Sequence, residues 1–80
     1  MSKEVRTEMV KSLKKLSEQA RQHVRRARQD GLTQFKKRKA EISEDDLRNV
    51  NAYIQMLTDE CIGELKTLSE AKERDLTENI

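Results

Sequence analysis

The sequence predicts an all-α protein: a long, coiled-coil-like antiparallel two-helix hairpin that is part of a three-helix bundle or is completed by self-association. Three observations support this prediction. The 80 residues include no Pro and only two Gly. Two stretches repeat apolar residues at helical spacing and are separated by a short connection near residues 39–42. A connection this short makes the two helices antiparallel.

The composition leaves two alternatives, a disordered chain or long helices. Charged residues make up 40% of the chain and hydrophobic residues only 34%, with one Tyr and one Phe. A compact globule needs more apolar area than this to offset the conformational entropy of folding. High charge with few aromatics is typical of disorder, whereas helix-forming residues in a regular apolar repeat are typical of long helices. The periodicity favours the helices.

The first helix is expected over about residues 2–39. Ser2 is an N-cap by residue type, and Gly31 is the weak point, because Gly inside a helix costs roughly 1 kcal/mol relative to Ala. One narrow face of this helix carries apolar or small residues at steps of three and four, namely Val5, Met9, Leu13, Leu16, Ala20, Val24, Ala27, Gly31 and Phe35.

The second helix is expected over about residues 44–78. Ser43 is its N-cap, Asp46 takes the capping-box position, and Ile42 with Leu47 occupies the two positions of a hydrophobic staple. Acidic residues fill the first turn, where the helix dipole favours negative charge. The apolar stripe then repeats every 3.5 residues on average, as in a coiled-coil seam, through Leu47, Val50, Ile54, Leu57, Cys61, Leu65 and Leu68.

Each apolar stripe is wider than one partner helix needs, because Val10 and Ile62 lie beside the main stripes. This width predicts a third helix, supplied from outside the chain or by a second copy of it. The 80 residues then form a single helical domain. Cys61, the only cysteine, is expected to lie on the stripe as a small buried hydrophobe.

The sequence has no catalytic constellation, so the chain is not predicted to be an enzyme and no cofactor or metal is expected. It contains one histidine, His23, at the stripe edge or on the surface, and no metal-ligand spacing, phosphate loop or nucleophile motif. No apolar run approaches the ~20 residues of a membrane span. Its first residues do not resemble a signal peptide, so we do not expect a secreted protein.

The two halves of the chain differ sharply in charge. Residues 1–40 carry 13 Lys or Arg and 4 Asp or Glu, a net charge of +9, whereas residues 41–80 carry 4 and 11, a net charge of −7. A basic half suggests a polyanionic partner. The most informative cluster is Arg21, Arg25, Arg26 and Arg28. Three of the four recur at i, i+4 and i+7 on one side of the helix.

Two interpretations of this cluster compete. The arginines form a solvated face that pairs with acids of the second helix, or they bind RNA phosphates, for which the planar guanidinium is well suited. The basic run at residues 36–39 has an adequate structural explanation, since cations at the end of a helix satisfy its dipole and last carbonyls.

Four segments resemble the ribosome recycling factor family. Residues 20–30, ARQHVRRARQD, are similar to the family pattern A-R-x-x-x-R-x-x-R-R-D. Residues 41–46 match E-I-S-E-D-[DE], residues 57–59 match L-T-D, and residues 71–73 match A/D-K-E near the C-terminus. The segments occur in the same order and at the same intervals. The resemblance covers the chain from about Ser2 to Leu76.

The resemblance implies a helical domain corresponding to the second and third helices of the family's three-helix bundle. The first bundle helix and an inserted β-rich domain have no counterpart here. It further implies that Arg21, Arg25 and Arg28 bind large-subunit ribosomal RNA, and that elongation factor G is a partner in dissociating post-termination ribosomes. Gln29 and Gly31 depart from the family's usual Arg and Ala. The expected location is the bacterial cytoplasm or an organelle. The alternative is a structural coiled-coil oligomerisation module without an RNA partner.

Overall fold

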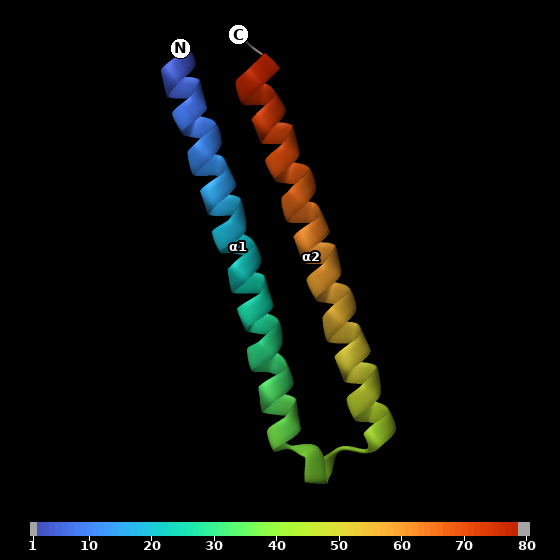
Figure 1. The fold of residues 1–80 in the computed structure, drawn as a ribbon. Helices are drawn as coiled ribbons and strands as arrows, with labels where there is room; N and C mark the ends of the chain where they lie inside the picture. Colours follow the sequence, from blue (N-terminus) through green and yellow to red (C-terminus); the bar gives the residue numbers. More distant parts are fainter. Residues whose placement is uncertain (1, 79–80) are drawn as a thin grey trace.

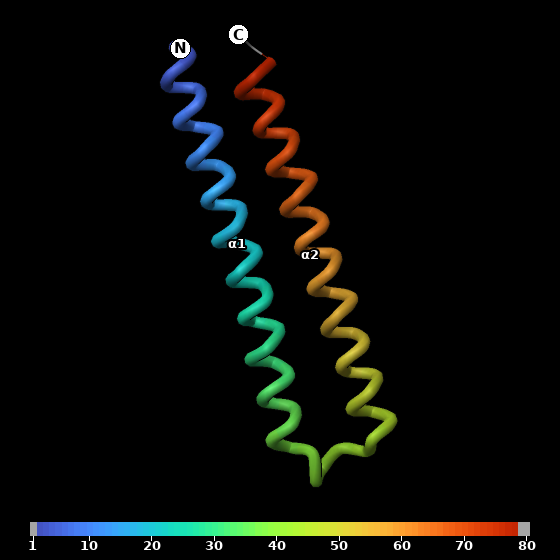
Figure 2. The backbone as a smooth tube through the Cα atoms, in the orientation of Figure 1, coloured from blue at the N-terminus to red at the C-terminus, as the bar shows by residue number. Residues whose placement is uncertain are grey.

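The computed structural model describes residues 2–78 as two long helices joined by a short turn. Helix α1 spans Lys3–Lys37, a 3-10 turn η1 spans Lys39–Glu41, and α2 spans Glu44–Glu78. The helices run antiparallel side by side, so both chain ends lie at the end of the rod opposite the turn (Figures 1 and 2). The rod measures 60 × 16 × 8 Å between its Cα extremes. The predicted all-α hairpin is confirmed.

Both predicted N-caps are confirmed. The Ser2 hydroxyl accepts a hydrogen bond from the backbone N–H of Val5 at 3.2 Å. The Ser43 hydroxyl accepts one from the N–H of Asp46 at 3.1 Å. Each bond satisfies one of the N–H groups that have no partner within a helix. Acidic residues occupy the first turn of α2, where they interact favourably with the helix dipole.

The first helix ends at Lys37, two residues before the expected end. Arg38 leaves the helical conformation and donates its backbone N–H to the Phe35 carbonyl at 3.0 Å. The following η1 turn and an extended Ile42 reverse the chain direction. A 3-10 turn is a frequent way for a helix to end when the chain must change direction at once. The last turn of α1 carries Lys36 and Lys37 beside its free carbonyls.

Small polar residues occupy the most buried positions described between the two helices. Ser17 and Thr58 are the most buried residues described, with exposed fractions of 8% and 7%. The hydroxyls of Ser17 and Ser69 share a hydrogen bond of 2.5 Å across the two helices. The Thr58 hydroxyl donates to the Ile54 carbonyl at 2.8 Å. Since these polar groups are hydrogen-bonded, their burial carries little penalty.

The predicted apolar stripes are only partly correct as the contact between the two helices. Val10 and Ile62, expected beside the stripes, are half-buried in the interface, whereas Cys61, expected to be buried, is exposed. We use the name interface residues for the half-buried or buried residues along the facing sides, namely Val10, Leu13, Ser17, Val24, Phe35, Thr58, Ile62, Leu65 and Ser69. The difference arises because each stripe is broad and a single partner covers only one of its edges.

The uncovered edges of the two stripes form a second surface, the apolar face, which consists of Val5, Met9, Leu16, Leu57, Cys61 and Leu68. All six side chains are exposed, Leu16 to 62% and Leu68 to 59%. In both helices these residues directly precede interface positions, for example Leu16 before Ser17 and Leu68 before Ser69. Successive residues of an α-helix point about 100° apart around the helix axis. Because the helices are antiparallel, this rotation brings both edges to the same side of the hairpin.

The first helix is continuous through Gly31. A methyl group added at Gly31 would meet the Ile54 Cδ1 atom at 3.9 Å, an ordinary van der Waals contact. We therefore expect Gly31→Ala to raise the free energy of unfolding by about 1 kcal/mol, through lower backbone entropy of the unfolded chain. Urea denaturation followed by circular dichroism measures the change. Unaltered or lower stability would contradict this account of Gly31.

Candidate nucleic-acid interface

The side of the hairpin opposite the apolar face is polar and carries most of the arginine cluster. Lys14 and Arg25 of α1 and Lys66 of α2 each directly follow an interface residue, which places them on this side. Arg21 and Arg28 are half-buried at its border with the interface. We call this surface the polar face. The structure thus brings together Arg21, Arg25 and Arg28 along one flank of α1.

Glu18 holds the first of these arginines in place. Its carboxylate accepts hydrogen bonds from Nε and an Nη atom of Arg21 at 3.0 and 2.8 Å, and from the Gln22 amide at 2.9 Å. Arg25 lies 3.8 Å away from the same carboxylate. The hydrogen bond from Arg21, followed by that from Gln22, lowers the pKa of Glu18 below its ordinary value. Glu18 is therefore ionised at neutral pH and partly neutralises the cluster.

Arg28 is positioned by residues of the second helix. Its Nε donates to the Gln55 side-chain oxygen at 2.8 Å, and the Gln55 amide nitrogen donates to an Asp59 carboxylate oxygen at 2.9 Å. This arrangement gives two residues of the L-T-D segment distinct structural roles. Thr58 packs between the helices, and Asp59 fixes the amide that orients Arg28. The Nη atoms of Arg28 are not used in the bond to Gln55.

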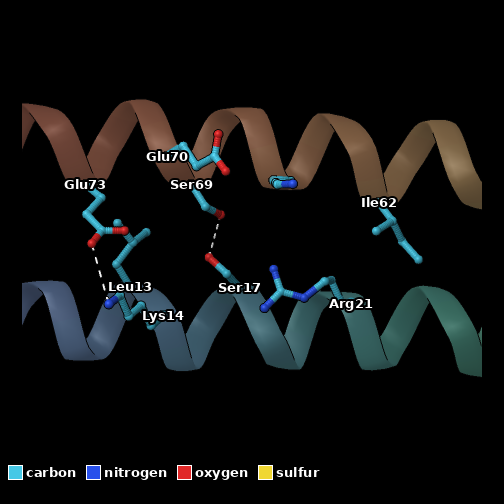
Figure 3. Close-up of a pocket in the computed structure, with 9 residues that line it drawn as sticks. Leu13, Lys14, Ser17, Arg21, Ile62, Ser69, Glu70 and Glu73 are labelled. Carbon is cyan, nitrogen blue, oxygen red and sulfur yellow. Dashed lines mark hydrogen bonds and ion pairs between the residues drawn. The ribbon is translucent and has the colours of Figure 1, made fainter.

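A groove on the polar face adds two lysines that sequence analysis missed. Its walls include Lys14, Arg21 and Lys66, with Glu70 and Glu73 on the α2 side. Figure 3 shows Lys14 and Arg21 on α1 facing α2 across the groove, with Lys14 directed towards Glu73. The Lys14 ammonium lies 3.5 Å from that carboxylate. Lys14 and Lys66 line the same groove although they lie far apart in the sequence, and no local sequence signal indicates this.

The remaining predicted positions lie elsewhere on the rod. Arg26 is exposed two residues after Val24, on the outer side of α1, and so does not share the flank of Arg21, Arg25 and Arg28. His23 is exposed. Within residues 2–78 no group of three or more His, Cys, Asp or Glu side chains could hold a metal ion. No described helix is both long and apolar enough to cross a membrane.

The arginines of the cluster interact mainly within α1. Their ion pairs are with Glu18 of the same helix, and the interhelical partner of Arg28 is a neutral amide. The ion pair between the helices on this face joins Glu73 to Lys14, which lies outside the arginine cluster. The Arg25 side chain is 51% exposed and that of Arg21 26%, so of these two arginines Arg25 is the more accessible to a ligand.

Comparisons with known proteins agree on one family. The family model described as "Ribosome recycling factor" matches residues 1–76. The ribosome-recycling factor of Mycoplasmopsis pulmonis is 42% identical over 73 residues, which cover 91% of this chain and 39% of that protein. The Staphylococcus saprophyticus protein of the same name is 41% identical over 78 residues, 95% of this chain and 42% of the relative.

A third relative, the ribosome-recycling factor of Caldicellulosiruptor bescii, is 38% identical over 80 residues, 98% of this chain and 44% of that protein. The chain thus spans about two fifths of the length of the curated relatives it matches. No solved structure matches the chain.

Proposed function

The chain belongs to the ribosome recycling factor family, and on this premise we propose that its polar face binds large-subunit ribosomal RNA as part of ribosome recycling. The observation that supports the proposal most is the placement of Arg21, Arg25 and Arg28 on one flank, away from the apolar face. A third helix or a second copy can cover the apolar face without blocking these arginines.

The proposed mechanism is neutralisation of RNA phosphates. Each guanidinium presents several N–H donors in a planar fork that suits phosphate oxygens. Contacts of this kind release the cations condensed on the RNA, so the affinity falls steeply as salt rises. The surface shows charge and shape but no arrangement for reading bases. We therefore expect binding to depend on the fold of the RNA backbone at its site more than on its sequence.

The proposal extends to the partner and location that the family resemblance implies. Elongation factor G would act on the ribosome to which this chain is bound, and dissociation of the post-termination ribosome would follow. The curated relatives named above come from bacteria, which favours the bacterial cytoplasm over an organelle.

The test is binding of the labelled chain to purified large ribosomal subunits over a series of salt concentrations. We expect saturable binding whose log affinity falls linearly with log salt, with a slope of about −0.7 to −0.9 per phosphate contacted. Binding that is absent even at low salt would overturn the proposal. It would favour the alternative function, a structural oligomerisation module whose charges are solvated.

Glu18 competes with RNA for the same arginines, which leads to a second prediction. Glu18→Gln removes a carboxylate that is 2.8 Å from Arg21 and 3.8 Å from Arg25. Both guanidinium groups become available and a repulsive charge disappears, so the affinity for large subunits is expected to rise about two- to fivefold. Fluorescence anisotropy at low salt measures this change.

The matched control is Glu8→Gln, which removes a Glu that is also on α1, exposed and paired with a cation at i+3, Lys11. Glu8 lies far from the arginine cluster along the rod, so its replacement is expected to change the affinity much less. Equal effects of the two substitutions would show that overall charge, not the polar face, governs binding.

A further inference from the structure

We propose that Gln55 and Asp59 of α2 are positioning residues for RNA binding, which hold Arg28 in place through a neutral amide and leave its charge to the RNA phosphate. Both residues act through Arg28 and need not touch the RNA. The inference rests on the proposed function. It gives a part in RNA binding to α2, whose 4 Lys or Arg and 10 Asp or Glu give this helix a net charge of −6.

The amide of Gln55 has one orientation that satisfies both of its neighbours. Its oxygen accepts from Nε of Arg28 at 2.8 Å, and its nitrogen donates to Oδ1 of Asp59 at 2.9 Å. A guanidinium only donates hydrogen bonds, and an ionised carboxylate only accepts them. A flipped amide would therefore lose both bonds. Asp59 thus determines that the oxygen of the amide, and not its nitrogen, faces Arg28.

A neutral partner distinguishes Arg28 from Arg21. The Glu18 carboxylate accepts from Nε and an Nη atom of Arg21, so it orients that guanidinium and also cancels part of its charge. Gln55 accepts from Nε of Arg28, and the carboxylate that orients the amide is held one side chain further away. The terminal edge of the Arg28 guanidinium is not part of this bond, and such an edge can bind two phosphate oxygens at once.

Positioning of this kind raises the affinity by reducing the conformational freedom that is lost on binding. An arginine that its ligand must order weakens binding by roughly two- to tenfold relative to an arginine that is already held in place. Arg28 and Gln55 are both half-buried, and their hydrogen bond joins the two helices. Arg28 is therefore held in place only when the helices are paired, so RNA binding depends on the closed hairpin.

The free chain tests the positioning before any RNA is added. In the nitrogen-15-labelled chain, the hydrogen on Nε of Arg28 should exchange with water about threefold or more slowly than that of the exposed Arg26, because it is hydrogen-bonded. Gln55→Leu, which removes both hydrogen bonds of the amide without a change of charge, should abolish this difference. Equal exchange at Arg28 and Arg26 in the wild-type chain would overturn the proposal.

Binding to purified large ribosomal subunits tests the function of this arrangement. Gln55→Leu is expected to weaken binding roughly three- to tenfold. The slope of log affinity against log salt should stay unchanged, because Arg28 still contacts its phosphate, whereas loss of Arg28 itself lowers that slope by about 1. In the Arg28→Ala background, Gln55→Leu should change the affinity by less than about twofold. An equal effect with and without Arg28 would show that Gln55 does not act through Arg28.

Ser69→Ala is the structural control, because it removes another hydrogen bond between the helices, the one with Ser17. This variant should keep its affinity for large subunits within about twofold of the wild-type value. If Ser69→Ala weakens binding as much as Gln55→Leu does, loosening of the hairpin explains both effects and the positioning role is wrong.

Two substitutions of Asp59 test its part while the charge is held equal. Asp59→Ala and Asp59→Asn remove the same negative charge, but only the asparagine keeps an oxygen that can accept from the Gln55 amide. Asp59→Asn should therefore bind large subunits about two- to fivefold more tightly than Asp59→Ala. Equal affinities of the two variants would show that Asp59 does not position the amide.

The neutrality of the amide has its own test. Gln55→Glu places a carboxylate directly against Nε of Arg28 and should weaken binding to large subunits about threefold more than Gln19→Glu does. Gln19 is exposed two residues after Ser17, on the outer side of α1, so the control makes the same change of charge away from Arg28. Equal losses would show that the neutral partner of Arg28 has no special value.

These experiments separate the positioning role from the proposed function. A wild-type chain that does not bind large subunits defeats the proposed function itself. A wild-type chain that binds, together with a Gln55→Leu variant that binds equally well, overturns only the role assigned to Gln55 and Asp59.

Discussion

Replacement of Arg25 and Arg28 together by alanine is expected to weaken binding to purified large ribosomal subunits about a hundredfold at low salt. Each arginine is assigned one or more charge-assisted hydrogen bonds to phosphate, which contribute ~1.5–3 kcal/mol each. The slope of log affinity against log salt should become less steep by about 2, one unit for each phosphate that is no longer bound. Fluorescence anisotropy over several salt concentrations measures both quantities.

The matched control is Arg48→Ala/Arg74→Ala, which removes the same number of arginines from exposed positions on α2. This control lowers the net charge by the same amount as the Arg25/Arg28 variant but leaves the arginines of α1 intact. The slope of log affinity against log salt should therefore change far less than in that variant. Because Arg28 is hydrogen-bonded to Gln55, circular dichroism must show that the variant keeps its helicity. If both double variants bind as the wild type does, the arginine cluster has no role in RNA binding.

Introduction of a lysine at Thr58 is expected to destabilise the hairpin by more than ~3 kcal/mol. Thr58 is 7% exposed between the two helices, so a longer side chain would have to displace its neighbours. Overpacking of this kind costs ~1–3 kcal/mol, and an ammonium group held away from water adds a desolvation penalty. Thermal unfolding followed by circular dichroism should show a large loss of helicity at room temperature.

The control at this position is Thr58→Val, which keeps the shape of the side chain and removes its hydroxyl. That hydroxyl donates only to the Ile54 carbonyl of its own helix, so the variant should lose less than about 1.5 kcal/mol. Stability close to that of the wild type for Thr58→Lys would show that the helices separate easily at this point. The packing role assigned to Thr58 would then be wrong.

The helices and their starts could be predicted from the sequence because their causes are local. Ser2 and Ser43 each bond to an N–H three residues ahead, and periodicity alone reveals the long helices. What could not be predicted is which edge of a broad stripe meets the partner. Cys61 illustrates this limit, because its spacing fits the seam while the structure leaves it exposed.

Two other features were beyond sequence analysis for different reasons. Ser17 and Thr58 are polar, so an apolar pattern passes over them although they are the most buried residues described. Lys14 and Lys66 belong to one groove but are separated by most of the chain. The predicted arginines Arg21 and Arg25 lie on one helix, so helical spacing alone was enough to group them.

The hairpin pairs residues in order outward from the turn, which has a consequence for how it opens. The Arg28–Gln55 hydrogen bond closes a segment of 27 residues and the Ser17–Ser69 hydrogen bond one of 52. The conformational entropy lost on closing the 52-residue segment costs only ~0.6 kcal/mol more than that lost on closing the 27-residue segment. However, once the Arg28–Gln55 bond has formed, the Ser17–Ser69 bond has to order only the residues between the two bonds on each helix. The rod should therefore behave as a zipper, with amide hydrogen exchange slowest near the turn and progressively faster towards the chain ends.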